Sequence, residues 1–313
     1  MSQRSFRIGT RGSRLALRQT EIVLKALRRL HPGASFEVRP VRTAGDQQAR
    51  ASLSEIGGRG VFVTELEREL LRGDIDIAVH SLKDLPSEET AGLLIAAVCR
   101  REDARDALIA REGRKLAGLP AGASVGTGSP RRAAQVRAAR PDLRLADIRG
   151  NVDTRIRKVQ AGEVDAVVLA AAGLARLGWL GRASEVIPPE VMLPAVGQGA
   201  LALQVRADDA GAIDLARAVD DAPTRQATAA ERAFLRRLGG GCQAAIAAFA
   251  ETDGEELRLR GLVAAAGEGG LLRGEVRGAT AEAEDLGAAL AESLLARGAS
   301  ALLATAPSGE AAP

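Results

Sequence analysis

Aromatic residues are scarce in this sequence. They make up 2% of the chain, as five Phe, one Trp and no Tyr. Proteins that bind single-stranded nucleic acids stack the bases on aromatic side chains, and the sequence shows neither zinc-finger spacing nor the heptads of a basic zipper. The composition therefore argues against a nucleic-acid-binding protein.

Cysteine and histidine are equally sparse, with two of each. Cys99 and Cys242 are too few for a disulfide framework. The two histidines, His31 and His80, are not at the spacing of metal ligands. We therefore expect no metal site.

Long apolar runs are also missing. No stretch of eighteen apolar residues occurs, so we expect no membrane span. The first six residues lack the apolar run of a secretion signal, which favours a cytoplasmic location. The 313 residues, of which 46% are hydrophobic, suffice for two or three domains with their own cores.

Basic residues are plentiful but of one kind. Only four of the 43 are lysines, and the net charge of the chain is +3. Between residues 130 and 160, nine basic residues stand against three acidic ones. The planar guanidinium fork suits carboxylates and phosphates. Codon composition also produces an arginine excess, so it is the clustering at 130–160 that points to a polyanionic ligand.

Short apolar runs alternate with helical patterns, which predicts α/β layers. Residues 6–8 read as a strand and residues 13–30 as an amphipathic helix with Ser13 as its N-cap. Further strands are expected at 36–41, 75–79 and 164–170, and a helix at 62–71. After residue 222 the pattern changes to that of a small α+β domain, with helices at 224–238 and 281–297 and strands near 243–250, 256–264 and 271–277.

Two turns of the sequence resemble each other. Gly-Thr-Arg-Gly-Ser at 9–13 and Gly-Thr-Gly-Ser at 126–129 each follow a strand and lead into a helix. Each would place backbone N–H groups and a hydroxyl at a helix N-terminus, where anions bind. The pair suggests two similar α/β domains that face one cleft. The alternative is that such turns are common wherever a strand meets a helix.

A second group of polar residues follows a buried strand. Ser81, Lys83 and Asp84 lie at the carboxyl end of the strand, where parallel α/β sheets place their ligands. These residues are candidates for catalysis, although Lys83 and Asp84 also fit a solvated ion pair. We expect the neighbouring His80 to be structural.

Cys242 follows three glycines at 239–241. This leaves its thiol sterically open and suits the attachment of a bulky group; a small buried residue after a helix stop is the alternative. Cys99 lies in an apolar run and is predicted to be in the core. The glycine-rich loop at 57–60 carries Arg59 and suggests a lid, although such loops are often only turns.

Together these segments resemble the hydroxymethylbilane synthase (porphobilinogen deaminase) family over nearly the whole chain. Eight motifs in order carry the resemblance: IGTRGS (8–13), GGRGVF (57–62), AVHSLKDLP (78–86), REDARD (101–106), GTGSPRR (126–132), RGNV (149–152), LPAVGQGA (193–200) and GGCQ (240–243).

The resemblance implies three domains: 1–99 with about 200–218, 100–199, and 219–313. The first two would be α/β domains similar to the halves of type-2 periplasmic binding proteins, and the third a small α+β domain that carries the cofactor cysteine. It also implies a dipyrromethane cofactor joined by a thioether to Cys242. Four molecules of porphobilinogen would be added with loss of ammonia, and water would release the linear tetrapyrrole. The family suggests a monomer.

The resemblance also implies residue roles. Asp84 would be the catalytic carboxylate, which stabilises positive charge on the reacting pyrroles. Arg59 would belong to the lid loop, where lysine is usual, and Phe62 would stack near the active site. The residues expected to bind the cofactor and substrate, mostly through their carboxylates, are Arg11, Ser13, Ser81, Lys83, Thr127, Ser129, Arg131, Arg132, Arg149, Arg155, Arg176 and Gln198.

Two rival interpretations remain. A non-catalytic two-lobed binding protein for a polycarboxylate or phosphate explains the matched turns but not the open Cys242. A nucleic-acid-binding protein that uses residues 130–160 leaves Asp84 and Cys242 without purpose. Only the synthase should be heavier than its 32.5 kDa chain by two pyrrole units.

Overall fold

The computed structural model describes residues 5–41, 63–239, 244–265, 267 and 269–304. The chain forms two compact units. The first consists of Met1–Glu102 and Gly199–Arg225, and the second of Asp103–Gln198 and Gln226–Pro313. The predicted positions Arg59, Phe62 and Cys242 lie outside the described residues.

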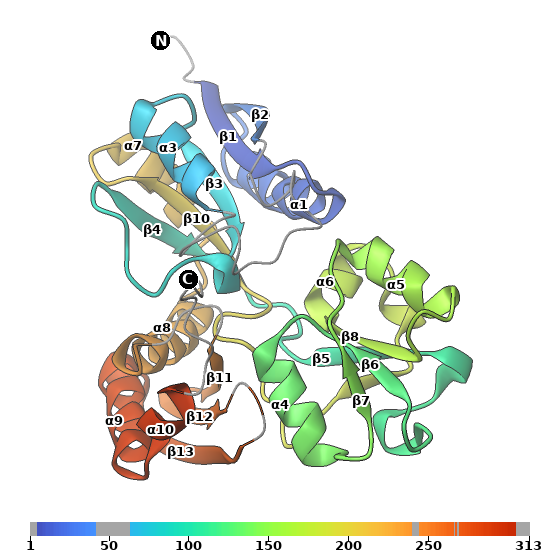
Figure 1. Cartoon of the computed structure of the whole chain (residues 1–313). Coiled ribbons are helices and arrows are strands. Elements are labelled where there is room, and N and C mark those ends of the chain that lie inside the picture. Colours follow the sequence, from blue (N-terminus) through green and yellow to red (C-terminus); the bar gives the residue numbers. More distant parts are fainter. Residues whose placement is uncertain (1–4, 42–62, 240–243, 266, 268, 305–313) are drawn as a thin grey trace, which may run out of the picture. The chain divides into compact units, whose positions relative to one another are not determined.

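The first unit is built on a five-stranded sheet in the order β2-β1-β3-β10-β4 (Figure 1). Strands β2 and β3 run parallel to β1, whereas β10 is antiparallel to both β3 and β4. Its elements are β1 (Ser5–Arg11), α1 (Arg14–Leu30), β2 (Ser35–Val41), α3 (Thr64–Arg72), β3 (Ile77–Ser81), η1 (Leu82–Asp84), β4 (Leu93–Val98), β10 (Leu201–Arg206) and α7 (Ala210–Arg217).

The second unit contains a sheet of the same design, in the order β7-β6-β8-β5-β9. Here β7 and β8 run parallel to β6, and β5 is antiparallel to both β8 and β9. Its elements are β5 (Asp106–Ala110), η2 (Arg111–Gly113), η3 (Leu116–Gly118), β6 (Ser124–Gly126), α4 (Pro130–Ala139), β7 (Arg144–Ala146), α5 (Val152–Gln160), β8 (Ala166–Ala170), α6 (Ala171–Arg176), η4 (Leu180–Arg182) and β9 (Glu185–Ile187).

The two sheets match strand for strand in order and direction. This repetition confirms the predicted fold class of two similar α/β layers. The predicted elements are also present, although β3 begins and ends two residues later than the expected strand at 75–79.

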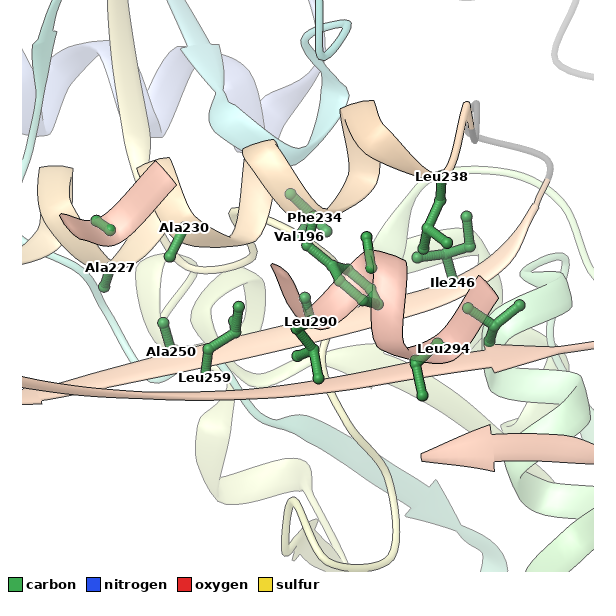
Figure 2. Packing of buried hydrophobic residues seen from close by; sticks show 14 of the residues in the cluster. Val196, Ala227, Ala230, Phe234, Leu238, Ile246, Ala250, Leu259, Leu290 and Leu294 are labelled. Atoms are coloured by element: carbon green, nitrogen blue, oxygen red, sulfur yellow. The ribbon is translucent and has the colours of Figure 1, made fainter. Parts of the chain in front are cut away.

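A three-stranded antiparallel sheet follows, in the order β11-β12-β13. Its elements are α8 (Ala222–Arg237), β11 (Ala245–Asp253), β12 (Glu256–Ala264), β13 (Leu271–Ala279), η5 (Thr280–Glu282), α9 (Ala283–Ala296) and α10 (Ala299–Ala304). Figure 2 shows Phe234 of α8 packed with Leu290 and Leu294 of α9 above the sheet. This is the predicted small α+β domain. It belongs to the second compact unit, so the division into three domains stays a prediction.

Helix α9 approaches α8 closely at Gly287. A Cβ there would meet the carbonyl oxygen of Ala230, and it would lie 2.9 Å from both Ala233 Cβ and Phe234 N. We predict that Gly287→Ala lowers the free energy of unfolding by about 1–3 kcal/mol, because overpacking outweighs the higher helix propensity of alanine. Urea denaturation measures this. Gly181→Ala, where a Cβ has no neighbour within 4 Å, should cost less; an equal loss in both variants would contradict the packing argument.

No helix among the residues that the structure describes is both long and apolar enough to span a membrane. Cys99, predicted to be in the core, is half-buried and packs against the core of the first unit.

Candidate active site

The two matched turns cap their helices in the same way. The Oγ of Ser13 accepts a hydrogen bond from the backbone N–H of Ala16 at 3.2 Å, at the start of α1. The Oγ of Ser129 accepts one from the N–H of Arg132 at 3.5 Å, at the start of α4. In the second turn, the Oγ1 of Thr127 also accepts a hydrogen bond from the backbone N–H of Ser129 at 3.1 Å. The predicted equivalence of the turns is confirmed, and each is a helix N-terminus suited to an anion.

In the first unit, the remaining predicted residues gather at the carboxyl ends of β1 and β3. The parallel register pairs Gly9 with Ala78, so the carboxyl ends of both strands lie on the same side of the sheet, which we call the carboxyl edge. Arg11 ends β1, Ser81 ends β3, and Lys83 and Asp84 follow in η1. The four side chains are half-buried. This edge is where a parallel sheet binds ligands.

Ser81 is held by a neighbour from α1. The Nε2 of the buried Gln19 donates to Ser81 Oγ at 3.0 Å. This bond ties the end of β3 to the helix that Ser13 caps. The two parts of this edge are therefore connected by side chains.

His80 precedes these residues and is buried. Burial lowers the pKa of its imidazole to about 4; a hydrogen bond with Gln204 opposes this shift, and repulsion from Arg11 adds to it. The ring is therefore neutral at pH 7, as a structural histidine should be, and it adds no charge next to Arg11.

The low pKa of His80 predicts a pH-dependent stability. The imidazole titrates near 6.5 when the chain is unfolded and near 4 when it is folded, so below pH 6.5 the unfolded state binds the extra proton. The free energy of unfolding should then fall as the pH drops from about 6.5 to 4, by up to roughly 1.4 kcal/mol per pH unit. Urea denaturation across this range should show a shallower decline for His80→Gln than for the parent chain. Parallel declines would contradict the assignment.

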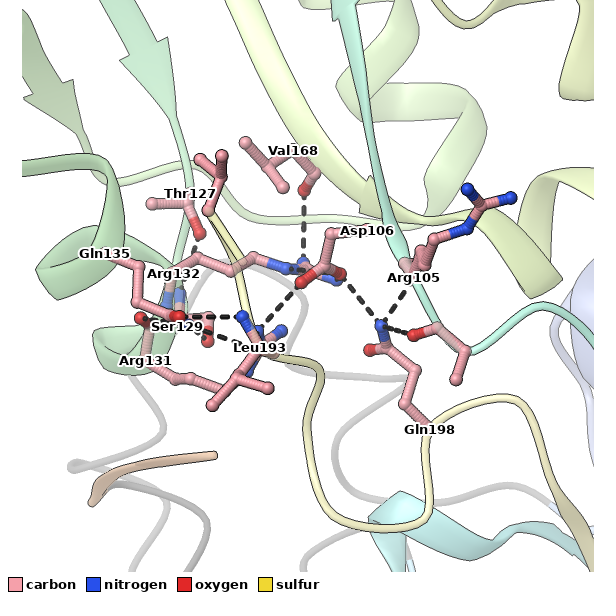
Figure 3. A network of polar contacts seen from close by, with 12 residues as sticks. Arg105, Asp106, Thr127, Ser129, Arg131, Arg132, Gln135, Val168, Leu193 and Gln198 are labelled. Carbon is pink, nitrogen blue, oxygen red and sulfur yellow. Dashed lines mark hydrogen bonds and ion pairs between the residues drawn. The ribbon is translucent and has the colours of Figure 1, made fainter. Parts of the chain in front are cut away.

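In the second unit, Arg131 and Arg132 stand in the first turn of α4 and are almost fully buried. Figure 3 shows both side chains directed at Asp106, the first residue of β5. Arg131 Nη1 lies 2.8 Å from Asp106 Oδ2, and Arg132 Nη2 lies 2.7 Å from Oδ1. Their expected part in binding carboxylates stays a prediction, since in the structure they bind a carboxylate of the chain itself.

Arg155 adds a further positive charge near Arg132. Burial, followed by repulsion from Arg132 and Arg149, lowers the pKa of Arg155 to about 10. Arg155 Nε donates to the carbonyl oxygen of Gly150 at 2.8 Å, and Arg149 pairs with Asp147 at 3.0 Å. We call Arg132, Arg149 and Arg155 the arginine cluster. Burial and the repulsion that Arg155 experiences from the other two would both be relieved by an anion bound nearby.

Arg176 is the last residue of α6, the helix that follows β8. It is half-buried. Because β8 occupies in its sheet the place that β3 occupies in the first, Arg176 follows a strand equivalent to the one before Lys83 and Asp84.

Gln198, which was expected to bind the ligand, is buried within the second unit. Its side chain is fully buried, and its Nε2 donates to the carbonyl oxygen of Ala104 at 2.7 Å and to Asp106 Oδ1 at 2.9 Å. These contacts hold Asp106, and the expected part of Gln198 in binding the ligand stays a prediction. Sequence reasoning missed Asp106, which stands in a motif that carried the resemblance without an assigned role. The only signal for it was the need to balance the charge of the basic stretch.

Two family models match this chain. A family model described as "Porphobilinogen deaminase, dipyromethane cofactor binding domain" matches residues 6–214. A second, "Porphobilinogen deaminase, C-terminal domain", matches residues 226–296.

Curated relatives carry the same name. A porphobilinogen deaminase of Roseiflexus sp. (strain RS-1) is 52% identical over 95% of this chain and 98% of its own length. That of Syntrophus aciditrophicus is 50% identical over 95% and 97%, and that of Brevibacillus brevis 46% over 96% and 96%.

Solved structures are more distant. The VFT2 domain of Bordetella pertussis BvgS is 16% identical, with a TM-score of 0.43 over 69% of this chain and 86% of that one. The methionine-binding protein MetQ is 11% identical, with a TM-score of 0.42 over 68% and 88%. On the matches to both family models and to these curated relatives, the chain belongs to the porphobilinogen deaminase family.

Proposed function

We propose that Asp84, Cys242 and the arginines at the starts of α4 and α5 carry out the reaction of this family in this chain. That reaction is the hydroxymethylbilane synthase reaction, a transfer that joins four porphobilinogen molecules and releases a linear tetrapyrrole. The observation that carries the assignment of residues is the arginine cluster. Each pyrrole unit brings an acetate and a propionate, so the growing chain is a polyanion of the kind such a cluster attracts.

Further residues are proposed to hold the carboxylates in both units. Charge-assisted hydrogen bonds of this type contribute roughly 1.5–3 kcal/mol each when water is excluded. The proposed set is Arg11, Ser13, Ser81, Lys83, Thr127, Ser129, Arg131, Arg132, Arg149, Arg155 and Arg176.

The donors of this set fit the dipyrromethane cofactor that the family uses. Within each unit, basic side chains, hydroxyls and a helix N-terminus supply donors of the kind from which pyrrole carboxylates accept hydrogen bonds. When bound, the cofactor supplies the pyrrole carbon to which the first substrate molecule is joined. We propose that the sulfur of Cys242 holds it by a thioether.

Asp84 is proposed to act on the pyrrole nitrogens. In each condensation the aminomethyl C–N bond of porphobilinogen breaks and ammonia leaves. A C–C bond then forms between the methylene carbon that lost ammonia and a ring carbon of the attacking pyrrole, and this ring carbon loses its proton. Positive charge develops on the pyrroles during both changes. A carboxylate fixed in η1 accepts hydrogen bonds from their N–H groups and stabilises this charge.

The stoichiometry of ammonia release tests the function. The purified chain, incubated with porphobilinogen, should release four molecules of ammonia for each linear tetrapyrrole formed. A binding protein for polycarboxylates would retain porphobilinogen without releasing ammonia, and this result would overturn the proposal.

We further propose that the protein acts as a cytoplasmic monomer without nucleic acid or membrane partners. The near-balanced charge of +3 and the 2% aromatic content support the lack of a nucleic acid partner. Light scattering should give a mass near 32.5 kDa. A mass twice as large would contradict the monomer.

A further inference from the structure

Asp106 occupies an unusual electrostatic position in the second unit. Its carboxylate is fully buried and binds two guanidinium groups at once. Burial opposes its ionisation, but the charges of Arg131 and Arg132 prevail and lower its pKa. One carboxylate balances one guanidinium, so a positive charge is left over in a buried place. This buried excess of positive charge costs free energy in the unliganded protein, and a bound anion would compensate it.

The placement of the two arginines increases this cost. The first turn of α4 reads Pro-Arg-Arg-Ala, with two cations and no acidic residue. The helix dipole disfavours cations at an N-terminus and favours anions there. The local structure is therefore unfavourable for the protein alone and favourable for a protein that binds an anion at this turn.

The orientation of Arg132 is fixed by three hydrogen bonds. Its Nε and Nη2 donate to Asp106 Oδ1 at 3.1 and 2.7 Å, and its Nη1 donates to the carbonyl oxygen of Val168 at 3.1 Å (Figure 3). These contacts use three of the five N–H donors of the guanidinium. Asp106 thereby holds the member of the arginine cluster whose repulsion contributes to the lowered pKa of Arg155.

Asp106 is itself held in place. Gln198 Nε2 donates to its Oδ1 at 2.9 Å and to the carbonyl oxygen of Ala104. Arg131 also bonds the carbonyl oxygen of Leu193, which Gln135 Nε2 approaches at 3.0 Å. The carboxylate thus lies at the centre of a network of hydrogen bonds and ion pairs at the start of α4.

We propose that Asp106 is a positioning residue for substrate binding: it holds Arg131 and Arg132 in the orientation that presents their positive charge to the carboxylates of the growing pyrrole chain. This inference rests on the proposed function. It extends that function to a residue whose own charge has the wrong sign for the ligand.

The direction in which one substitution changes anion binding separates a positioning role from simple charge balance. If only total charge mattered, Asp106→Asn would remove a negative charge and strengthen anion binding. If Asp106 positions the arginines, the same substitution should weaken binding. The probe is benzenehexacarboxylate, and its dissociation constant is measured by calorimetry. We expect a rise of tenfold or more, together with a tenfold rise in KM for porphobilinogen and a much smaller change in kcat.

Asp76 provides the matched control. It is a buried carboxylate of the first unit that binds Arg7 at 2.7 Å and Arg206 at 3.3 Å. Asp76→Asn should destabilise the fold in a similar way and leave the dissociation constant and KM within twofold of the parent. Equal losses of binding in both variants would show that only stability is affected and would overturn the proposal.

A second variant keeps the test valid if Asp106→Asn does not fold. Asp106→Glu preserves the charge and displaces the carboxylate by one methylene, so it should also weaken binding of the probe. Unchanged or tighter binding in a folded variant at position 106 would overturn the inference. A parent chain that releases no ammonia from porphobilinogen would instead overturn the proposed function.

Discussion

Asp84→Ala is expected to fold like the parent chain and to lose at least about a hundredfold in kcat. Removal of one preorganised charged group costs about 3–4 kcal/mol of transition-state stabilisation in comparable sites. Asp84 lies in η1 and is half-buried, so its loss leaves no large cavity. The measurement is the rate of ammonia release at saturating porphobilinogen, with circular dichroism as the check on folding.

A neighbouring carboxylate serves as the control for this experiment. Glu89 is exposed, five residues further along the chain, and Glu89→Ala should retain the kcat of the parent within about twofold, because an exposed charge is screened by solvent. If Asp84→Ala turned over at a rate near that of the parent, the assigned role of the carboxylate would be wrong.

Cys242→Ser is expected to abolish both covalent attachment and turnover. A serine hydroxyl is a much weaker nucleophile than a thiolate, so the variant should have the mass of the bare chain, whereas the parent should exceed 32.5 kDa by two pyrrole units. Denatured intact mass and ammonia release measure the two effects on one sample.

The second cysteine makes this comparison specific. Cys99→Ser should keep both the additional mass and the activity, because Cys99 packs against the core of the first unit. A mass excess that persisted in Cys242→Ser, or that disappeared in Cys99→Ser, would place the attachment elsewhere.

Local patterns predicted much of the fold because they depend on neighbouring residues. The helix at 13–30 and its Ser13 cap followed from apolar spacing and one hydroxyl, and the structure has α1 and its cap at this position. The equivalence of the turns at 9–13 and 126–129 also followed from local chemistry. The strand that inserts between β3 and β4 is different. It is Leu201–Arg206, more than a hundred residues further along the chain, and the resemblance to the family, rather than the residues, suggested that this segment joins the first domain.

The candidate site was predicted less completely, because a charged side chain does not reveal its partner. Arg131 and Arg132 read as ligand-binding residues, yet their carboxylate partner in the structure is Asp106, about 25 residues earlier in the chain. Gln198 stands in a conspicuous Gly-Gln-Gly motif and is nevertheless buried against the same aspartate. In each case the partner within the chain depends on how distant segments pack, which local patterns do not show.

The most direct test of the account is the intact mass of the denatured chain after brief exposure to a small excess of porphobilinogen. If Asp84 drives stepwise growth of a chain anchored at Cys242, the spectrum should contain the protein with two pyrrole units and a ladder of species with further whole units. Formation of tetrapyrrole by a protein that keeps the single mass of the bare chain would contradict it.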